Sequence, residues 1–257
     1  MARRSTGKGA AVPPRVVLFD LDDTLVDHTG AVLGAFRSLR QSYPALARRR
    51  ARELAALYQL HLERVHAAVV RGRISAEAAR LRRFAAVFES VGESPGATQL
   101  QRVVATYQAE YRRAPRLLPG ALGVLRAVRR EASVGVLSNN RRLEQAEKVA
   151  TFGLGPYLDF VLTSEELPWA KPDPRCFRAA VERAGSVPSR ATMVGDSWSA
   201  DVAGALAAGL GAVWLNREGE RPGRARRVPQ LASLQPVRPA VQTILGALPR
   251  ARGANHY

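Results

Sequence analysis

The chain of 257 residues is 46% hydrophobic and 24% charged, which is ordinary for a folded protein and sufficient for one α/β domain or a core with a smaller insert. Its formal net charge of +17 comes almost entirely from arginine, since lysine occurs only at positions 8, 148 and 171. The basic residues are dispersed, without interleaved aromatic residues or a recognised nucleic-acid-binding motif. We therefore interpret the charge as that of a solvated surface that attracts anionic substrates, and prefer this interpretation to a nucleic-acid-binding protein.

The cysteine content and the hydropathy of the chain bear on its location. The single cysteine, Cys176, excludes an internal disulfide framework and fits the reducing cytoplasm. No apolar run approaches the roughly 20 residues that a transmembrane helix needs, so we expect no membrane association. Residues 1–14 contain arginines but no apolar stretch, and we interpret them as a disordered basic tail and not as a secretory signal.

Arg15–Phe19 is the first of five short apolar runs that we predict to be strands. The run is continuous rather than alternating, which is typical of a strand buried on both faces of a parallel sheet. The later runs are Ser133–Leu137, Phe160–Thr163, Ala191–Val194 and Gly211–Leu215.

Helical patterns separate the later runs. They cover Gly120–Glu131, Arg141–Phe152, Pro174–Ala184 and Ser199–Ala208, and a last one covers Val237–Leu248. Strands that alternate with such helices predict an α/β fold with a Rossmann-like, doubly wound parallel sheet. In such sheets, ligands bind beyond the carboxyl ends of the strands.

The stretch from residue 28 to residue 115 has a different pattern. Strand signals are absent, and amphipathic helices rich in Ala, Leu and Arg take their place. We therefore predict an all-helical cap domain at residues 28–115, inserted into a catalytic core made of residues 15–27 and 116–249. Such a cap would act as a lid over the ligand-binding edge of the sheet. Residues 250–257 are expected to be frayed.

Polar clusters follow the first, second and fourth strands, and one precedes the helix after the third. In chain order their members are Asp20, Asp22 and Thr24, then Ser138 and Asn139, then Lys171, and finally Asp196 and Asp201. Because a parallel sheet brings its strand ends together, we expect these distant residues to surround one pocket.

The chemistry of these residues is complementary. Asp20 and Asp22 are two positions apart in an extended segment, so their side chains should point the same way. With Asp196 they form a group of carboxylates whose mutual repulsion calls for a cation, and oxygen ligands without histidine suit Mg²⁺. Lys171 could neutralise a phosphate group, and Ser138 could donate to a phosphoryl oxygen.

Several of these residues also have a purely structural interpretation, including Lys171 as a solvated loop lysine. Asp20 and Asp22, taken alone, fit a turn after a strand. Ser138 and Asn139 fit the end of a strand or a helix cap. Asp201 would be favoured by the helix dipole in a first helical turn. The order of all the clusters favours a functional interpretation.

The order Asp20-x-Asp22-x-Thr24, Ser138, Lys171-Pro172 and Gly195-Asp196 resembles the haloacid dehalogenase-like hydrolase superfamily over residues 15–216. The resemblance implies that Asp20 attacks phosphorus and that Asp22 acts as general acid and then as general base. It also implies Mg²⁺ bound by Asp20, the backbone carbonyl of Asp22 and Asp196. In the same scheme Asp201 supports the site by orienting Lys171 or a metal-bound water, and Thr24, Ser138, Asn139 and Lys171 bind phosphate.

The same resemblance narrows the reaction. Dehalogenases of this family lack the second aspartate, and its phosphomutases usually carry Gly-Val where this chain has Asp23-Thr24, so we expect hydrolysis of a small phosphate monoester. Arg71–Ser75, Arg83-Phe84 and Gly209–Asn216 resemble the pyrimidine nucleotidase and N-acylneuraminate-9-phosphatase branch. That likeness favours a nucleoside monophosphate or a sugar phosphate. The alternatives are a 2-haloacid dehalogenase and a basic nucleic-acid-binding protein on a degenerate hydrolase fold.

Overall fold

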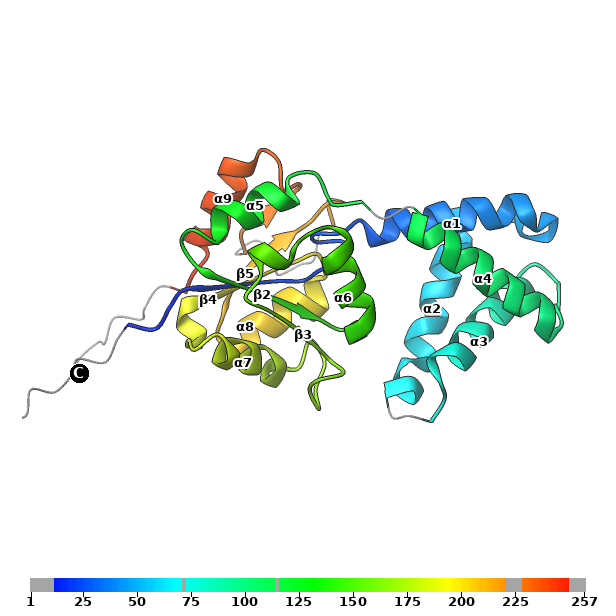
Figure 1. Ribbon diagram of the computed structural model, residues 1–257, viewed down its shortest axis with the longest axis horizontal. Coiled ribbons are helices and arrows are strands. Elements are labelled where there is room, and N and C mark those ends of the chain that lie inside the picture. The colour runs from blue at the N-terminus through cyan, green and yellow to red at the C-terminus, as the bar shows by residue number, and fades with distance from the viewer. Residues whose placement is uncertain (1–11, 71–72, 114–115, 221–227, 250–257) are drawn as a thin grey trace, which may run out of the picture. The chain divides into compact units, whose positions relative to one another are not determined.

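A computed structural model describes residues 12–70, 73–113, 116–220 and 228–249, which form two compact units (Figure 1). One unit consists of the residues before Val26 and after Leu117, and the other is Val26–Leu117. Most of the expected basic tail, all of the expected frayed end at 250–257, and Arg71 lie outside the described residues.

The first unit is built on a six-stranded sheet with the order β3-β2-β1-β4-β5-β6 and with every pairing parallel. The strands are β1 (Val16–Phe19), β2 (Ser133–Ser138), β3 (Phe160–Thr163), β4 (Ala191–Gly195), β5 (Gly211–Leu215) and β6 (Gln230–Leu231). All five predicted strands are present within one residue of their expected ends, and β6 is an addition. The α/β class is confirmed.

Strand β1 lies inside the sheet, between β2 and β4. Phe19, its last residue, lies opposite Val136 of β2 and Val194 of β4. All four residues of β1 are buried, as the continuous apolar run predicts. The chain leaves β2 for β3 on one side and returns to β4 on the other, so the strand order reverses around β1. In open α/β sheets this reversal is where ligands bind.

Helices cover both faces of this sheet, with α5 and α9 on one face and α7 and α8 on the other (Figure 1). The helices of the unit are α5 (Ala121–Val128), α6 (Arg142–Thr151), α7 (Pro174–Arg183), α8 (Gly204–Ala208) and α9 (Val237–Gly246), with short 3-10 turns at Gly155–Tyr157 and Pro188–Arg190. The helix predicted at Ser199–Ala208 differs from expectation. Its first part is a π-helical turn at Trp198–Ala203, and α8 follows it.

The second unit is helical in the part that the structure describes. It contains α1 (His28–Ser42), a 3-10 turn (Pro44–Arg48), α2 (Ala51–Val70), α3 (Ala76–Glu89) and α4 (Ala97–Arg113). Side chains of Asp27 and Ser75 accept hydrogen bonds from backbone N–H groups in the first turns of α1 and α3, which accounts for where these helices begin. A separate apolar core includes the packed rings of Phe36, Tyr58 and Phe84.

The helices of the described segments include none that combines the length and the apolar character needed to cross a membrane.

A substitution at Gly135 in β2 would measure how tightly the sheet is packed. A Cβ at this position would lie 2.3 Å from the ring of Phe160, so Gly135→Ala should lower the free energy of unfolding by about 1–3 kcal/mol through overpacking. Gly155 has no heavy atom within 4 Å of a Cβ, and Gly155→Ala should change stability by less than about 0.5 kcal/mol. Urea denaturation measures both variants, and equal midpoints would contradict the packing argument.

Candidate active site

Asp20 continues the central strand β1 beyond its last residue. Its backbone N–H donates to the carbonyl of Val194 in β4 at 2.9 Å, which fixes it beside the end of the neighbouring strand. Three residues on, Asp23 has a φ of 60°, a left-handed conformation that aspartate tolerates better than most residues. This conformation turns the chain away from the sheet. Asp20 is thereby left at the carboxyl edge, where Asp196 follows β4.

Lys171 joins two acidic side chains in the interior of the site. Its Nζ lies 2.6 Å from Oδ1 of Asp20 and 2.6 Å from Oδ1 of Asp201. Burial lowers the pKa of Lys171, but the attraction of Asp20 and Asp201 outweighs this effect and raises the pKa above its usual range. The pKa of Asp20 lies well above its ordinary value because burial and the charges of Asp201, Asp196 and Asp22 outweigh the attraction of Lys171.

Asp196 adds a third carboxylate to this group. Oxygens of Asp20, Asp196 and Asp201 lie within 4.8 Å of one another. Burial and the nearby charges of Asp201 and Asp23 raise the pKa of Asp196 to about 7. The hydroxyl of Thr24 donates to Oδ1 of Asp196 at 3.2 Å. One ammonium group therefore faces three carboxylates, and this all-oxygen donor set fits a hard divalent cation such as Mg²⁺.

The π-helical turn brings Asp201 against the end of β4. Oδ2 of Asp201 accepts a hydrogen bond from the backbone N–H of Ser197 at 3.0 Å. Gly195 permits this approach, since a Cβ there would lie 2.3 Å from Oδ2 of Asp201. A glycine immediately before Asp196 is thus required by the position of another acidic side chain.

Asn139 fixes the loop that carries Lys171. Its Nδ2 donates to the carbonyl of Lys171, and its Oδ1 accepts from the N–H of Lys171, both at 2.8 Å. Both polar atoms of the amide are thereby engaged by the backbone. Ser138, which precedes it, accepts hydrogen bonds from the side chain of Gln145 at 2.6 Å and from the N–H of Asn140 at 3.1 Å.

Asp22 lies in a second polar network that sequence reasoning missed. Its carboxylate accepts from Lys148 Nζ at 2.6 Å, Gln145 Nε2 at 3.0 Å and Asn140 Nδ2 at 3.1 Å. Nζ of Lys148 also lies 3.1 Å from Glu144. Burial lowers the pKa of Lys148, but the charges of Asp22 and Glu144 raise it above its usual value. The available signal was helical spacing, because positions 144, 145 and 148 share one face of α6.

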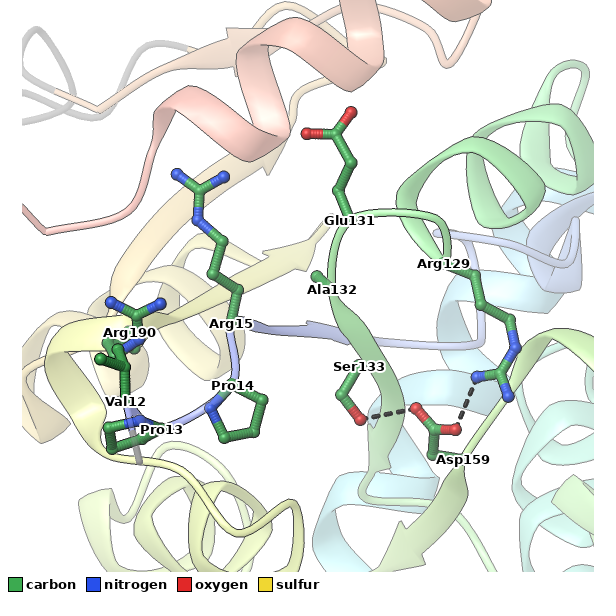
Figure 2. A pocket seen from close by; sticks show the side chains of 10 residues that line it. All are labelled: Val12, Pro13, Pro14, Arg15, Arg129, Glu131, Ala132, Ser133, Asp159 and Arg190. Atoms are coloured by element: carbon green, nitrogen blue, oxygen red, sulfur yellow. Dashed lines mark hydrogen bonds and ion pairs between the residues drawn. The ribbon is translucent and has the colours of Figure 1, made fainter. Parts of the chain in front are cut away.

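A cavity of about 620 Å³ lies elsewhere, at the amino ends of β1 and β2 (Figure 2). Arg15 and Ser133, at the amino ends of these two strands, are among its lining residues. On one side of it, Asp159 accepts from Ser133 Oγ at 2.5 Å and from Arg129 Nη1 at 2.6 Å. No residue of the carboxylate cluster lines this cavity, so it is separate from the candidate active site.

The chain belongs to the haloacid dehalogenase-like hydrolase family, whose model matches residues 14–209. The crystal structure of the HAD-hydrolase YfnB from Bacillus subtilis, bound to magnesium, has a TM-score of 0.71 at 22% identity and covers 91% of this chain and 99% of its own. That of 2-haloacid dehalogenase from Pseudomonas syringae has a TM-score of 0.59 at 28% identity, covering 89% of this chain and 97% of its own.

Several curated relatives bear the names of phosphatases. Pyrimidine 5'-nucleotidase YjjG of Escherichia coli is 40% identical over 38% of this chain and 44% of its own length. Phosphoserine phosphatase of Thermus thermophilus is 39% identical over 56% of this chain and 57% of its length. The chain thus spans about half the length of these two relatives. Ribulose-1,5-bisphosphate 5-phosphatase of Halopiger xanaduensis is 31% identical over 76% of this chain and 81% of its length.

The raised pKa of Asp196 makes stability depend on pH. Its folded pKa of about 7 exceeds the unfolded value of about 3.9, so the folded state holds a proton between these values and the free energy of unfolding falls as pH rises through them. In EDTA we expect a decline of at most about 1.4 kcal/mol per pH unit from this group, ending near pH 7. Urea denaturation should show a smaller decline for Asp196→Asn, and an unchanged slope would contradict the assignment.

Proposed function

We propose that the protein is a Mg²⁺-dependent phosphomonoester hydrolase that forms an aspartyl-phosphate on Asp20. The observation that carries this proposal is the buried Lys171 ammonium group 2.6 Å from Asp20 and from Asp201, with Asp196 in the same cluster. A carboxylate held by one lysine at the carboxyl edge of a parallel sheet is a suitable nucleophile for a bound phosphate. The names of several relatives support the same class of reaction.

In the first step a carboxylate oxygen of Asp20 attacks phosphorus. A bond forms between this oxygen and phosphorus, the ester P–O bond breaks, and Asp22 donates a proton to the leaving oxygen. Lys171 holds the other oxygen of Asp20 and counters the negative charge of the phosphoryl group.

In the second step water hydrolyses the aspartyl-phosphate. Asp22, now ionised, removes a proton from the water as its oxygen attacks phosphorus. The bond between phosphorus and Asp20 breaks, which releases phosphate and restores the carboxylate. The same side chain therefore gives a proton in one step and accepts one in the next.

The divalent cation would be held by Asp20, Asp196 and the backbone carbonyl of Asp22, with Asp201 close to the same group. When bound, it neutralises negative charge on the carboxylates and on the substrate phosphate. The proposal is supported by the raised pKa values of Asp20 and Asp196, which reflect burial first and the negative charge of neighbouring carboxylates second.

Ser138 and Lys171 are proposed as phosphate ligands because each has a proton to offer: the Ser138 hydroxyl accepts two hydrogen bonds, and the three protons of the Lys171 ammonium group face two carboxylates. Thr24 and Asn139 would contribute mainly by fixing Asp196 and Lys171, because their polar side-chain atoms are engaged there. The helical unit is proposed to act as the lid that selects the leaving group. We propose a nucleoside monophosphate or a sugar phosphate as substrate, in line with relatives that are named for substrates of these two classes.

Asp20→Asn tests the nucleophile. The amide cannot form the phosphoenzyme, so kcat/KM for 4-nitrophenyl phosphate in Mg²⁺ should fall by at least about 10³-fold. Glu182→Gln, an exposed substitution on α7 that also removes one negative charge, should leave the rate unchanged. Excess EDTA should abolish wild-type turnover, and Mg²⁺ should restore it. Undiminished hydrolysis by Asp20→Asn, or in EDTA, would refute the mechanism.

A 2-haloacid dehalogenase is the second candidate, because the fold also matches the enzyme of that name from Pseudomonas syringae. A halide leaves without a proton, so such an enzyme needs no acid at the position of Asp22. We expect no chloride release from 2-chloropropionate by protein that hydrolyses phosphate esters. Ion chromatography in EDTA would detect the halide, and its release without phosphatase activity would reverse the choice.

A further inference from the structure

One face of α6 carries three polar side chains that the mechanism above leaves without a function. Gln145 is fully buried, Lys148 is 7% exposed, and Glu144 is half-buried. Polar groups in such positions are costly to bury unless each finds a partner. Here the partners include the carboxylate of Asp22, on which the hydrogen bonds from α6 converge.

We propose that Lys148 is a positioning residue for the reaction, which holds the carboxylate of Asp22 in a fixed orientation for proton transfer. The inference rests on the proposed function, because it assigns Lys148 a role only through Asp22. Lys148 approaches Oδ1 of Asp22 at 2.6 Å, and Gln145 approaches Oδ2 at 3.0 Å. Two donors from one helix therefore bind the two carboxylate oxygens of Asp22, which fixes both the position and the rotation of this carboxyl group.

The choice of lysine is itself informative in a chain whose basic residues are almost all arginine. An ammonium group is a compact charge with three donors, whereas a guanidinium group is a wide planar fork. The ammonium group of Lys148 lies between Asp22 at 2.6 Å and Glu144 at 3.1 Å in a buried position. Glu144 also pairs with Lys148, so the ammonium group keeps a negative partner while Asp22 carries a proton.

Leaving-group dependence distinguishes positioning of Asp22 from a structural role. A poor leaving group such as phenolate needs a proton from Asp22, whereas 2,4-dinitrophenolate departs without one. For Lys148→Met, kcat/KM for phenyl phosphate should fall about 10²-fold, while that for 2,4-dinitrophenyl phosphate should change less than about threefold. Because kcat/KM reports formation of the phosphoenzyme, the later hydrolysis step does not obscure the comparison.

Three further variants complete the test. Lys148→Arg keeps the charge and should recover part of the phenyl phosphate activity. Gln145→Met keeps the size but removes the donor to Asp22 and to Ser138. Loss of the Ser138 contact should lower kcat/KM for both substrates, and loss of the Asp22 contact should lower that for phenyl phosphate further; this difference tests the proposal if Lys148→Met fails to fold. Arg142→Met removes a positive charge from the exposed surface of the same helix and should leave kcat/KM unchanged for both substrates.

The outcomes separate this inference from the proposed function. If wild-type protein hydrolyses neither aryl phosphate in Mg²⁺, the function fails and the inference fails with it. If wild type is active and folded Lys148→Met loses the same factor for both substrates, the lysine serves the fold alone and the inference is overturned while the function stands. A selective loss with phenyl phosphate, recovered in part by Lys148→Arg, supports the inference.

Discussion

The arrangement of the candidate active site depends on one buried ammonium group. Lys171 contacts Asp20 and Asp201, and all three side chains are almost inaccessible to solvent. A buried charge costs several kcal/mol unless opposite charges and hydrogen bonds compensate it. Here each charge is compensated by at least one opposite charge in the same group. The end of β1, the loop before α7 and the π-helical turn are therefore fixed to one another by a single set of charges.

The parallel sheet makes this convergence possible, and small details of the backbone complete it. Because β1, β2 and β4 are parallel and neighbouring, their carboxyl ends lie at the same edge of the sheet, and the residues that follow these strands meet there. Gly195 leaves space for Asp201, and Asn139 holds the backbone of Lys171. These contacts show that polar and small residues around the cluster hold its charged members in place.

Both described lysines of this arginine-rich chain are used in the same way. Lys171 lies between Asp20 and Asp201, and Lys148 lies between Asp22 and Glu144. Asp20 and Asp22 both belong to the segment after β1, whereas Asp201 lies in the π-helical turn and Glu144 in α6. The proposed nucleophile and the proposed proton carrier thus each have a separate positive partner.

The sequence by itself determined the α/β class, the strands and the places where polar residues follow them, because burial of continuous apolar runs and helical periodicity are local patterns. It also indicated the family through the order of Asp20, Lys171 and Asp196. Tertiary structure alone decided which side chains pair with which in the site. Lys148 is 126 positions from Asp22, and no local pattern links them. The same holds for the π-helical turn that presents Asp201. Contacts across such separations arise only when the folded sheet brings the strand ends together, since no short-range preference encodes them.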